Sequence, residues 1–420
     1  MDSSFAPSQA LRALIAKGVH FVNPLTVTVA EDVDPDRISG EDTVIYPGCR
    51  IHGAKTVICH GARLGHEAPV VVEDCQIGPK VQLKGGYFRQ SVFLEGANLG
   101  LGAQVREACI LEEEANGAHC VGLKQTILFP FVTLGSLINF CDVLMSGGRS
   151  RKDHSEVGSG YIHFNYTPEG DKSTASLLGD VPRGVMLDRP PIFLGGQGGI
   201  VGPVQLGFGN VVAAGSVLRH DVPGDNQLVL DAPNRSLVKP YVARQYPALV
   251  RIVNNNVLYL ANLLALEEWY RHVRRRFFES DEQLFGLWLY EGVLEKLAQA
   301  KKERLGRLKT LALKMPESIV ASHHASQEPE AIRKKDLYQN IEPLLEIFNP
   351  SRSEQTGAAA RDRFVRGLID WRNDRGGNYL EVMKNLPDDL KQQGTAWLQA
   401  IVDQVRADAW RILPAYRPAA

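Results

Sequence analysis

The sequence predicts a parallel β-helix built from hexapeptide repeats, followed by an all-α helical domain. Two observations predict it: a six-residue spacing of branched aliphatic residues, and a sharp change in composition after about residue 223. Ile200, Leu206, Val212 and Leu218 lie six residues apart, with mostly small residues between them. This period matches neither the 3.6-residue helix nor the alternating strand. It is typical of a chain that turns three corners per coil and buries one aliphatic side chain per hexad.

The six-residue step recurs through most of the first half of the chain. It is followed by Ile45, Ile51 and Val57, by Val71, Ile77 and Leu83, by Leu99, Val105 and Leu111, by Val121 and Ile127, and by Val132 and Ile138. Each coil buries its aliphatic row only against its neighbours, so we expect one continuous solenoid. The repeat is interrupted over 145–160 and 167–191, and loops are expected to leave the solenoid there.

Glycine content divides the chain. Residues 43–223 contain 28 glycines, whereas 240–420 contain 8. We therefore predict a lead-in over 1–42, the β-helix over 43–223, a linker over 224–239 and a helical domain over 240–420. Helices are expected over 255–279, from a capping-box pattern at Ser280 and Gln283 to about Met315, and over 330–348, 358–373 and 379–412.

Charge and targeting signals exclude several classes of function. The chain has 47 Lys and Arg against 48 Asp and Glu, which gives no basis for binding nucleic acid or a charged membrane surface. Neither a signal peptide nor a long membrane-spanning run is recognised, so a cytoplasmic protein is expected. The six cysteines form no CxxC pair and are expected to be small buried residues of a reduced protein.

Two segments resemble a known family. They read GSGYIHFNYTPEGDKSTASLLGD and FLGGQGGIVGPVQLGFGNVVAAGSVLRHDV. They are similar to the acetyltransferase domain of the bifunctional UDP-N-acetylglucosamine pyrophosphorylase/glucosamine-1-phosphate N-acetyltransferases, over roughly residues 120–223. The resemblance implies a left-handed β-helix that forms a homotrimer, with its acyl-CoA site between neighbouring subunits. No LxAGxGTRM-like loop of the family's nucleotidyltransferase half is found.

The resemblance assigns roles to individual residues. Asn165 and Tyr166 match the pair that holds the sugar phosphate, and Lys172 matches a lysine in the following loop. Asn139, one coil earlier, also matches a residue of the family. Ser159 and Ala214 match small residues along acetyl-CoA, and Gly196 stands where the family has a serine that contacts it. These assignments imply a pocket for a sugar phosphate or nucleotide sugar such as UDP-N-acetylglucosamine, with acetyl-CoA or another acyl-CoA as co-substrate.

Other positions depart from the family. Its substrate-binding arginine falls on Thr133, and a lysine falls on Leu144. The segment VPRGVMLDRPP is an insertion. The substitutions at Thr133, Leu144 and Gly196 favour an alternative in which the chain is a non-catalytic nucleotide-sugar-binding or scaffold protein.

Acyl transfer needs a base, and histidine is the usual choice. His154 is the candidate, with Asp153 beside it to orient the ring, and His163 is a second. Arg149, Arg151, Lys152, Lys172, Arg183 and Arg189 are expected either to form a basic cleft for a phosphate or to be solvated surface. A remote alternative is a carbonic-anhydrase-like trimer binding zinc through His52, His60, His66 or His119. Their spacing does not match that family, so no metal is expected.

Overall fold

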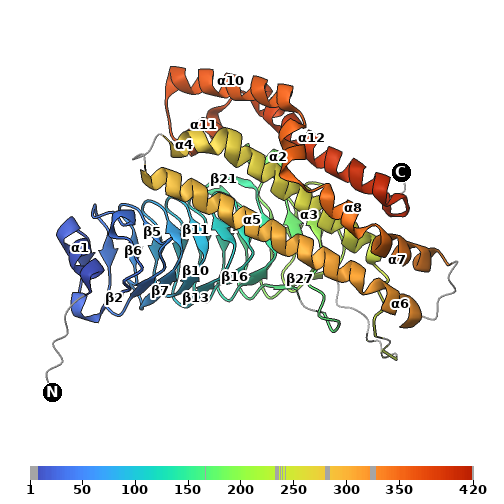
Figure 1. The fold of residues 1–420 in the computed structure, drawn as a ribbon, viewed down its shortest axis with the longest axis horizontal. Helices are drawn as coiled ribbons and strands as arrows, with labels where there is room; N and C mark the ends of the chain where they lie inside the picture. The colour runs from blue at the N-terminus through green and yellow to red at the C-terminus, as the bar shows by residue number, and fades with distance from the viewer. Residues whose placement is uncertain are drawn as a thin grey trace.

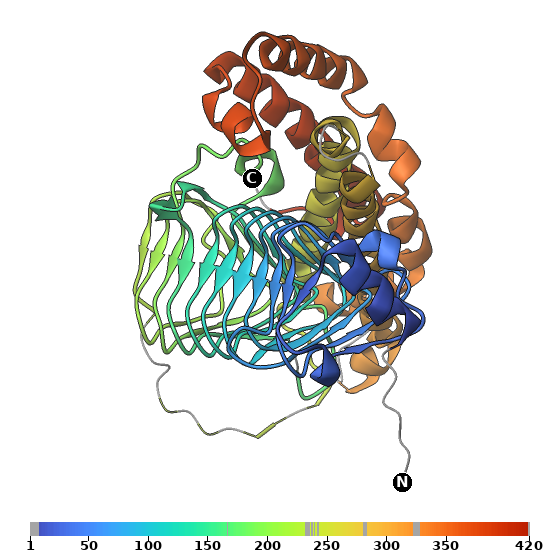
Figure 2. The ribbon, with the colours of Figure 1, turned by 90° about the vertical axis from the view of Figure 1, so that its left-hand side faces the viewer.

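A computed structural model of the chain describes residues 8–418 apart from 166, 232–235, 237, 239, 242, 280–283 and 322–327. Three long sheets form the sides of a solenoid, and a group of helices lies along one of them (Figures 1 and 2). The structure confirms the predicted fold class, a parallel β-helix of hexapeptide repeats followed by an α-helical region. Within the three sheets every recorded strand pairing is parallel, and the antiparallel pair is a separate hairpin.

The strands of each side are short. Sheet A contains β1 (His20–Phe21), β3 (Val44–Ile45), β6 (Arg63–Leu64), β9 (Gln82–Leu83), β12 (Asn98–Leu99), β15 (Asn116–Gly117), β18 (Thr133–Leu134), β23 (Glu156–Val157), β26 (Phe193–Leu194), β29 (Val211–Val212) and β31 (Leu228–Val229). Sheet B contains β2 (Thr28–Val29), β4 (Arg50–His52), β7 (Val70–Glu73), β10 (Gly86–Arg89), β13 (Ala103–Val105), β16 (Gly122–Lys124), β19 (Asn139–Cys141), β24 (Ile162–Phe164), β27 (Gly199–Val201) and β30 (Val217–Leu218). Sheet C contains β5 (Val57–Ile58), β8 (Gln76–Ile77), β11 (Ser91–Phe93), β14 (Cys109–Leu111), β17 (Ile127–Leu128), β20 (Val143–Met145), β25 (Ser176–Leu178) and β28 (Gln205–Leu206).

The six-residue period has a direct structural meaning. Ile200, Leu206, Val212 and Leu218 lie on β27, β28, β29 and β30, so successive hexads visit sheets B, C, A and B. All four side chains are buried. Each is stacked on an equivalent residue one coil away, as where Ile200 pairs with Leu218. One hexad therefore makes one side of a coil, and the buried rows form the core.

The chain leaves the solenoid at defined corners. Following the chain, it passes from sheet A to B, from B to C and from C to A, which gives an A–B, a B–C and a C–A corner in every coil. The first interruption, 145–160, includes a hairpin of β21 (Gly148–Ser150) and β22 (Asp153–His154) at the C–A corner. The second contains a loop over 165–175 at the B–C corner and α2 (Val181–Gly184) at the next C–A corner.

The N-terminal end of the solenoid is covered by a short helix. Strands of sheets A and B already begin at His20 and Thr28, before the start predicted at residue 43. Ahead of them, α1 (Gln9–Lys17) begins at Ser8, whose hydroxyl accepts from Leu11 N and donates to Val29 O at 2.9 Å. Leu11 and Leu14 of α1 are buried. The helix therefore closes the first coil. Two 3₁₀ turns, Pro24–Thr26 and Pro35–Arg37, follow in the next segments.

The C-terminal half is helical, as predicted. It contains α3 (Leu249–Trp269), a π-helical turn (Tyr270–Arg274), α4 (Arg275–Phe278), α5 (Leu284–Leu313), α6 (Met315–Ala321), α7 (Pro329–Gln339), α8 (Ile341–Glu346), α9 (Pro350–Gln355), α10 (Ala358–Arg375), α11 (Tyr379–Asn385), α12 (Asp388–Ile412) and a 3₁₀ turn (Pro414–Tyr416). The one helix expected over 379–412 is two helices, because Pro387 lacks an N–H and disfavours helix at the residue before it. The capping pattern at Ser280 and Gln283 lies outside the described residues.

Helices α3 and α5 cover sheet C. Helix α5 contacts β5, β8, β11 and β14, and α3 contacts β25 (Figure 1). Among the described residues, the helical run Leu249–Phe278 is long and apolar enough to cross a membrane by length and composition alone, but 72% of its most apolar window is buried inside the protein. Its apolar surface is therefore largely covered by the rest of the chain.

Buried ionic groups join the solenoid to the helices. At the C–A corner after β14, Tyr270 donates to the carboxylate of Glu112, and Arg274 pairs with Glu113. Burial is the main effect on Glu112 and raises its pKa to about 7, although Arg274 opposes the rise. Protons thus bind to Glu112 more readily in the folded than in the unfolded chain.

This pKa predicts a pH-dependent stability. Between the ordinary pKa of a glutamate, 4.5, and about 7, the folded chain holds more protons than the unfolded chain, so Glu112 stabilises the fold less as pH rises through this interval. Glu112→Gln keeps an oxygen acceptor for Tyr270 and removes the titration. From pH 5 to pH 8, the unfolding free energy of the natural protein should fall relative to the variant by about 2 kcal/mol. Urea denaturation at both pH values measures this, and parallel pH profiles for the two proteins would contradict it.

Candidate functional site

The residues matched to acyl-CoA lie together at the A–B corner. Ser159, Gly196 and Ala214 occupy this corner in three successive coils: Gln197 N donates to Ser159 O at 2.8 Å, and Gly215 N donates to Gly196 O at 2.9 Å. The backbones approach closely here, because a Cβ added to Gly195 would lie 2.2 Å from Ala214 N. Ser136 N also donates to the Ser159 hydroxyl at 3.1 Å. The result is a smooth backbone ridge with few side chains.

Asn139 stands on the outer face of sheet B. It is exposed at the start of β19 and lines a surface cavity of about 520 Å³ together with Gln104, Arg106 and Gly122. The cavity lies where Gly122, paired with Asn139 across the sheet, contributes no side chain. Cys141, two residues along the same strand, is mostly buried, and burial raises its pKa.

The loop matched to sugar-phosphate binding lies at the B–C corner and is held by the helices. Asn165 hydrogen-bonds to the carboxyl of Asp142, which is buried. Asp142 forms an ion pair with Arg304 of α5 at 3.0 Å, and Arg304 Nη1 also donates to Lys172 O at 2.7 Å. Burial raises the pKa of Asp142, with Arg304 opposing the rise. Tyr166 lies outside the described residues.

Two more contacts hold the same loop. Asp171 accepts from Tyr246 Oη at 2.7 Å and pairs with Lys314 Nζ at 2.7 Å. Asn256 of α3 donates to Ser173 O at 3.0 Å. The loop therefore belongs structurally to the contact between solenoid and helices.

The two histidines considered as bases have different surroundings. His154 is half-buried in the hairpin at the C–A corner, and its Nδ1 has no hydrogen-bond partner among the described residues. Asp153, expected to orient it, pairs with Arg149 at 2.5 Å. His163 is buried in the core with Nε2 2.8 Å from Ser176 Oγ. Burial lowers the pKa of His163 to about 3, so its ring is neutral at physiological pH.

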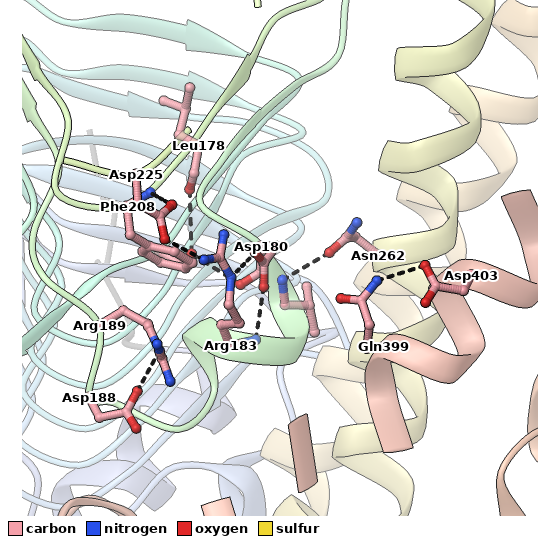
Figure 3. Close-up of polar contacts among 12 residues, drawn as sticks. Leu178, Asp180, Arg183, Asp188, Arg189, Phe208, Asp225, Asn262, Gln399 and Asp403 are labelled. Atoms are coloured by element: carbon pink, nitrogen blue, oxygen red, sulfur yellow. Dashed lines mark hydrogen bonds and ion pairs between the residues drawn. The ribbon is translucent and has the colours of Figure 1, made fainter. Parts of the chain in front are cut away.

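Most of the basic residues near the interruptions are already paired. Arg183 of α2 bonds to Asp180 at 2.6 Å and Asp225 at 2.5 Å and lies over the ring of Phe208, while Arg189 pairs with Asp188 (Figure 3). In the hairpin, Arg151 Nη1 donates to Phe131 O and to Thr133 Oγ1 at 3.0 Å. The guanidinium of Arg151 thus reaches the position where the resembled family carries its arginine.

The insertion over 181–191 docks the helical region. Val181 N donates to Asn262 Oδ1 of α3 at 2.9 Å, and α2 packs against both α3 and α12 (Figure 3). A Cβ on Gly394 of α12 would lie 2.5 Å from Met186 Cε, so the insertion fits closely against that helix. The insertion is therefore part of the contact between the solenoid and the helices.

Within one copy of the chain, the three groups of candidate residues do not meet. The acyl-CoA positions are at the A–B corner, Asn165 and Lys172 at the B–C corner, and His154 at the C–A corner. Sequence reasoning missed Asp142 and Arg304, because ion-pair partners 162 positions apart leave no local pattern. In the described part of the chain, no cluster of three or more His, Cys, Asp or Glu side chains is arranged to hold a metal ion. Of the six cysteines, Cys120 is exposed and the other five are buried.

Comparison with known proteins confirms the resemblance found in the sequence. The chain is 28% identical over 213 residues to the bifunctional protein GlmU of Thermotoga maritima, covering 51% of this chain and 42% of the relative. It is 28% identical to GlmU of Fervidobacterium nodosum and 27% identical to that of Trichlorobacter lovleyi, over 53% and 52% of this chain. No family model matches. The chain spans less than half the length of these relatives, consistent with similarity to their acetyltransferase β-helix domain.

The Asp142–Arg304 pair should be a major support of the loop at the B–C corner. Asp142→Ala leaves the Arg304 guanidinium, 2% exposed, without its carboxylate. We expect a loss of about 3–5 kcal/mol of unfolding free energy. Arg149→Met, which removes the exposed pair with Asp153, should cost less than about 1 kcal/mol. Guanidinium denaturation of both variants tests this, and equal losses would refute it.

Proposed function

We propose that this protein is an acyl-CoA-dependent acyltransferase that acts on a sugar phosphate or a nucleotide sugar in the cytoplasm. The observation that carries the proposal is the backbone ridge of Ser159, Gly196 and Ala214. The thioester and pantetheine chain of an acyl-CoA are neutral and hydrogen-bond well to peptide groups. A ridge with few side chains leaves room for the pantetheine to lie along the backbone. The similarity to the GlmU proteins supports the same class of reaction.

In this proposal each group has one task. Acetyl-CoA or another acyl-CoA lies along the A–B corner. Asn139, Asn165, Tyr166 and Lys172 hold the acceptor, the lysine ammonium favouring its phosphate. His154 takes the proton from the attacking amine or hydroxyl as the carbonyl carbon is attacked, and the thiolate of coenzyme A leaves. No metal takes part.

A homotrimer is part of the proposal, because the three groups lie at separate corners. Apolar side chains are exposed on the two faces beside the A–B corner: Phe193, Val211 and Leu228 on sheet A, and Ile162 and Phe164 on sheet B. Sheet C is covered by α3 and α5, so sheets A and B are the faces available for packing between copies. Exposed apolar patches of this kind often mark contacts between proteins.

A second candidate function has its own support. The loop that carries Asn165 and Lys172 is fixed by Asp142, Arg304 and Lys314, and Leu144, where the family has a lysine, is buried. These features suit a protein that binds a nucleotide sugar, or acts as a scaffold, without turnover.

Ligand-induced thermal shifts separate the two functions, because stabilisation grows with ligand concentration relative to Kd. The acyltransferase should respond to acetyl-CoA as well as to UDP-N-acetylglucosamine or sugar phosphates. With a responding acceptor, His154→Ala should lower kcat at least a hundredfold, whereas Lys172→Ala should mainly raise KM. Release of the coenzyme A thiol measures turnover. Unchanged turnover in both variants would remove the acyltransferase proposal, and a response to sugar nucleotides alone would favour the binding protein.

The trimer is tested separately. Phe164→Asp combined with Val211→Asp should convert the assembly to monomers in light scattering after gel filtration and abolish acyl transfer. Val320→Asp, at an exposed apolar position on α6, is the matched control and should leave mass and activity unchanged. A natural protein that is already monomeric would argue against the assembly.

A further inference from the structure

A cavity of about 390 Å³ lies between the solenoid and the helices, and none of the candidate acyltransferase residues lines it. Its floor is made by the C–A corners of early coils, including His60, Pro79 and Leu94. Its walls come from α4, the start of α5 and α11. Helices α4 and α11 lie together at this end of the helical region (Figure 1), where the rings of Phe277 and Tyr379 are 5.4 Å apart. The volume falls within the range of small-molecule sites.

One buried ion pair forms the polar end of this cavity. Arg274 is 1% exposed and donates through Nη2 to Glu113 Oε1. Its guanidinium lies 3.7 Å from the ring centre of Tyr379 and 5.1 Å from that of Phe278, so its position is fixed. Both Arg274 and Glu113 line the cavity.

The pair is incomplete as a hydrogen-bonding unit. Nε and Nη1 of Arg274 and Oε2 of Glu113 have no hydrogen-bond partner among the described residues. Buried polar atoms in proteins nearly always have one, and exceptions call for an explanation. The unpartnered donors and the unpartnered acceptor are buried close together beside the cavity, because one hydrogen bond already joins the two residues. The aromatic rings account for the position of the guanidinium but supply no acceptor in the plane of its N–H groups.

His60, Glu95, Arg372 and Asn378 also line the cavity, and most of the remaining lining is apolar or aromatic. Phe277, Phe278, Phe285, Leu289 and Leu380 contribute to it. Such walls favour a flat, weakly hydrated ring, and aromatic side chains pack well against the faces of planar ligands. A free phosphate or carboxylate fits poorly, because the lining holds as many carboxylates, Glu95 and Glu113, as guanidinium groups, Arg274 and Arg372.

We propose that this cavity binds a planar heterocycle that presents an N–H donor beside a carbonyl acceptor, the edge that uracil and guanine carry. The N–H of the ligand donates to Glu113 Oε2, and its carbonyl accepts from Arg274. The ring lies among the phenylalanines of α4 and α5. The cavity joins the helices to the early coils of the solenoid and shares no lining residue with the groups assigned to acyl transfer.

Isothermal titration of the full chain with uridine and guanosine tests the proposal. Each should bind, and 3-methyluridine and 1-methylguanosine, which lack the ring N–H, should bind at least tenfold more weakly. Glu113→Gln should weaken uridine or guanosine binding about tenfold or more. The glutamine amide has only one oxygen, so when that oxygen accepts from Arg274, the NH₂ group faces the N–H of the ligand. Leu380→Trp should fill the cavity and abolish binding. Glu156→Gln is the matched control for Glu113→Gln: it removes an exposed carboxylate on the outer face of sheet A and should leave nucleoside binding unchanged.

Each arm has a result that overturns the proposal. Absence of binding by both nucleosides at millimolar concentration does so, as does equal affinity for the methylated ligands, a comparison that needs no variant to fold. Binding that survives in Glu113→Gln and Leu380→Trp but is lost in Lys172→Ala would place the nucleoside at the B–C corner and refute this site. Loss of acyl transfer in His154→Ala bears only on the proposed function.

Discussion

The stacking of one buried aliphatic per hexad is the interaction on which the rest of the structure depends. A strand of two or three residues has too few hydrogen bonds and too little apolar surface to persist alone. Ile200 is buried because Leu218 lies above it and His163 below it in the same ladder. Each additional coil removes roughly the surface of three aliphatic side chains from water, on the order of 1.5–3 kcal/mol for each. The length of the solenoid is thus a condition of its stability.

The same stacking explains how the protein accommodates its loops. A coil must return to the same register after every excursion, and Leu134 on β18 pairs with Val157 on β23 although the hairpin lies between them. Chain inserted at a corner leaves the buried rows unchanged. The hairpin with His154, the loop with Lys172 and the insertion around Arg183 all use this freedom. The loop and the insertion bind mainly to the helices, through Arg304, Lys314 and Asn262.

Much of the fold could be predicted from the sequence, because the hexad period and the loss of glycine are local signals. The helical half could also be predicted, because α3 and α5 have apolar residues at helical spacing. The break at Pro387 shows how one residue divides a helix whose pattern continues past it. The sequence indicated that the candidate residues lie on loops between strands, but it did not reveal that the three groups lie at three different corners. Assigning a corner requires following all three sides of every coil, and the coils are irregular in length. Asp142 and Arg304, or Glu113 and Arg274, belong to different halves of the chain, and no spacing rule connects them.

Helix α1 has a consequence for the behaviour of the solenoid in solution. The first coil would otherwise present a ring of unpaired backbone groups, and such open edges invite further strands to add from other molecules. Leu11 and Leu14 pack over that end, and the Ser8 hydroxyl occupies the carbonyl of Val29. The helix therefore covers an edge to which strands of another molecule could otherwise add. A molecule without α1 would expose strands that match its own coils in spacing, and we expect such a molecule to associate end to end.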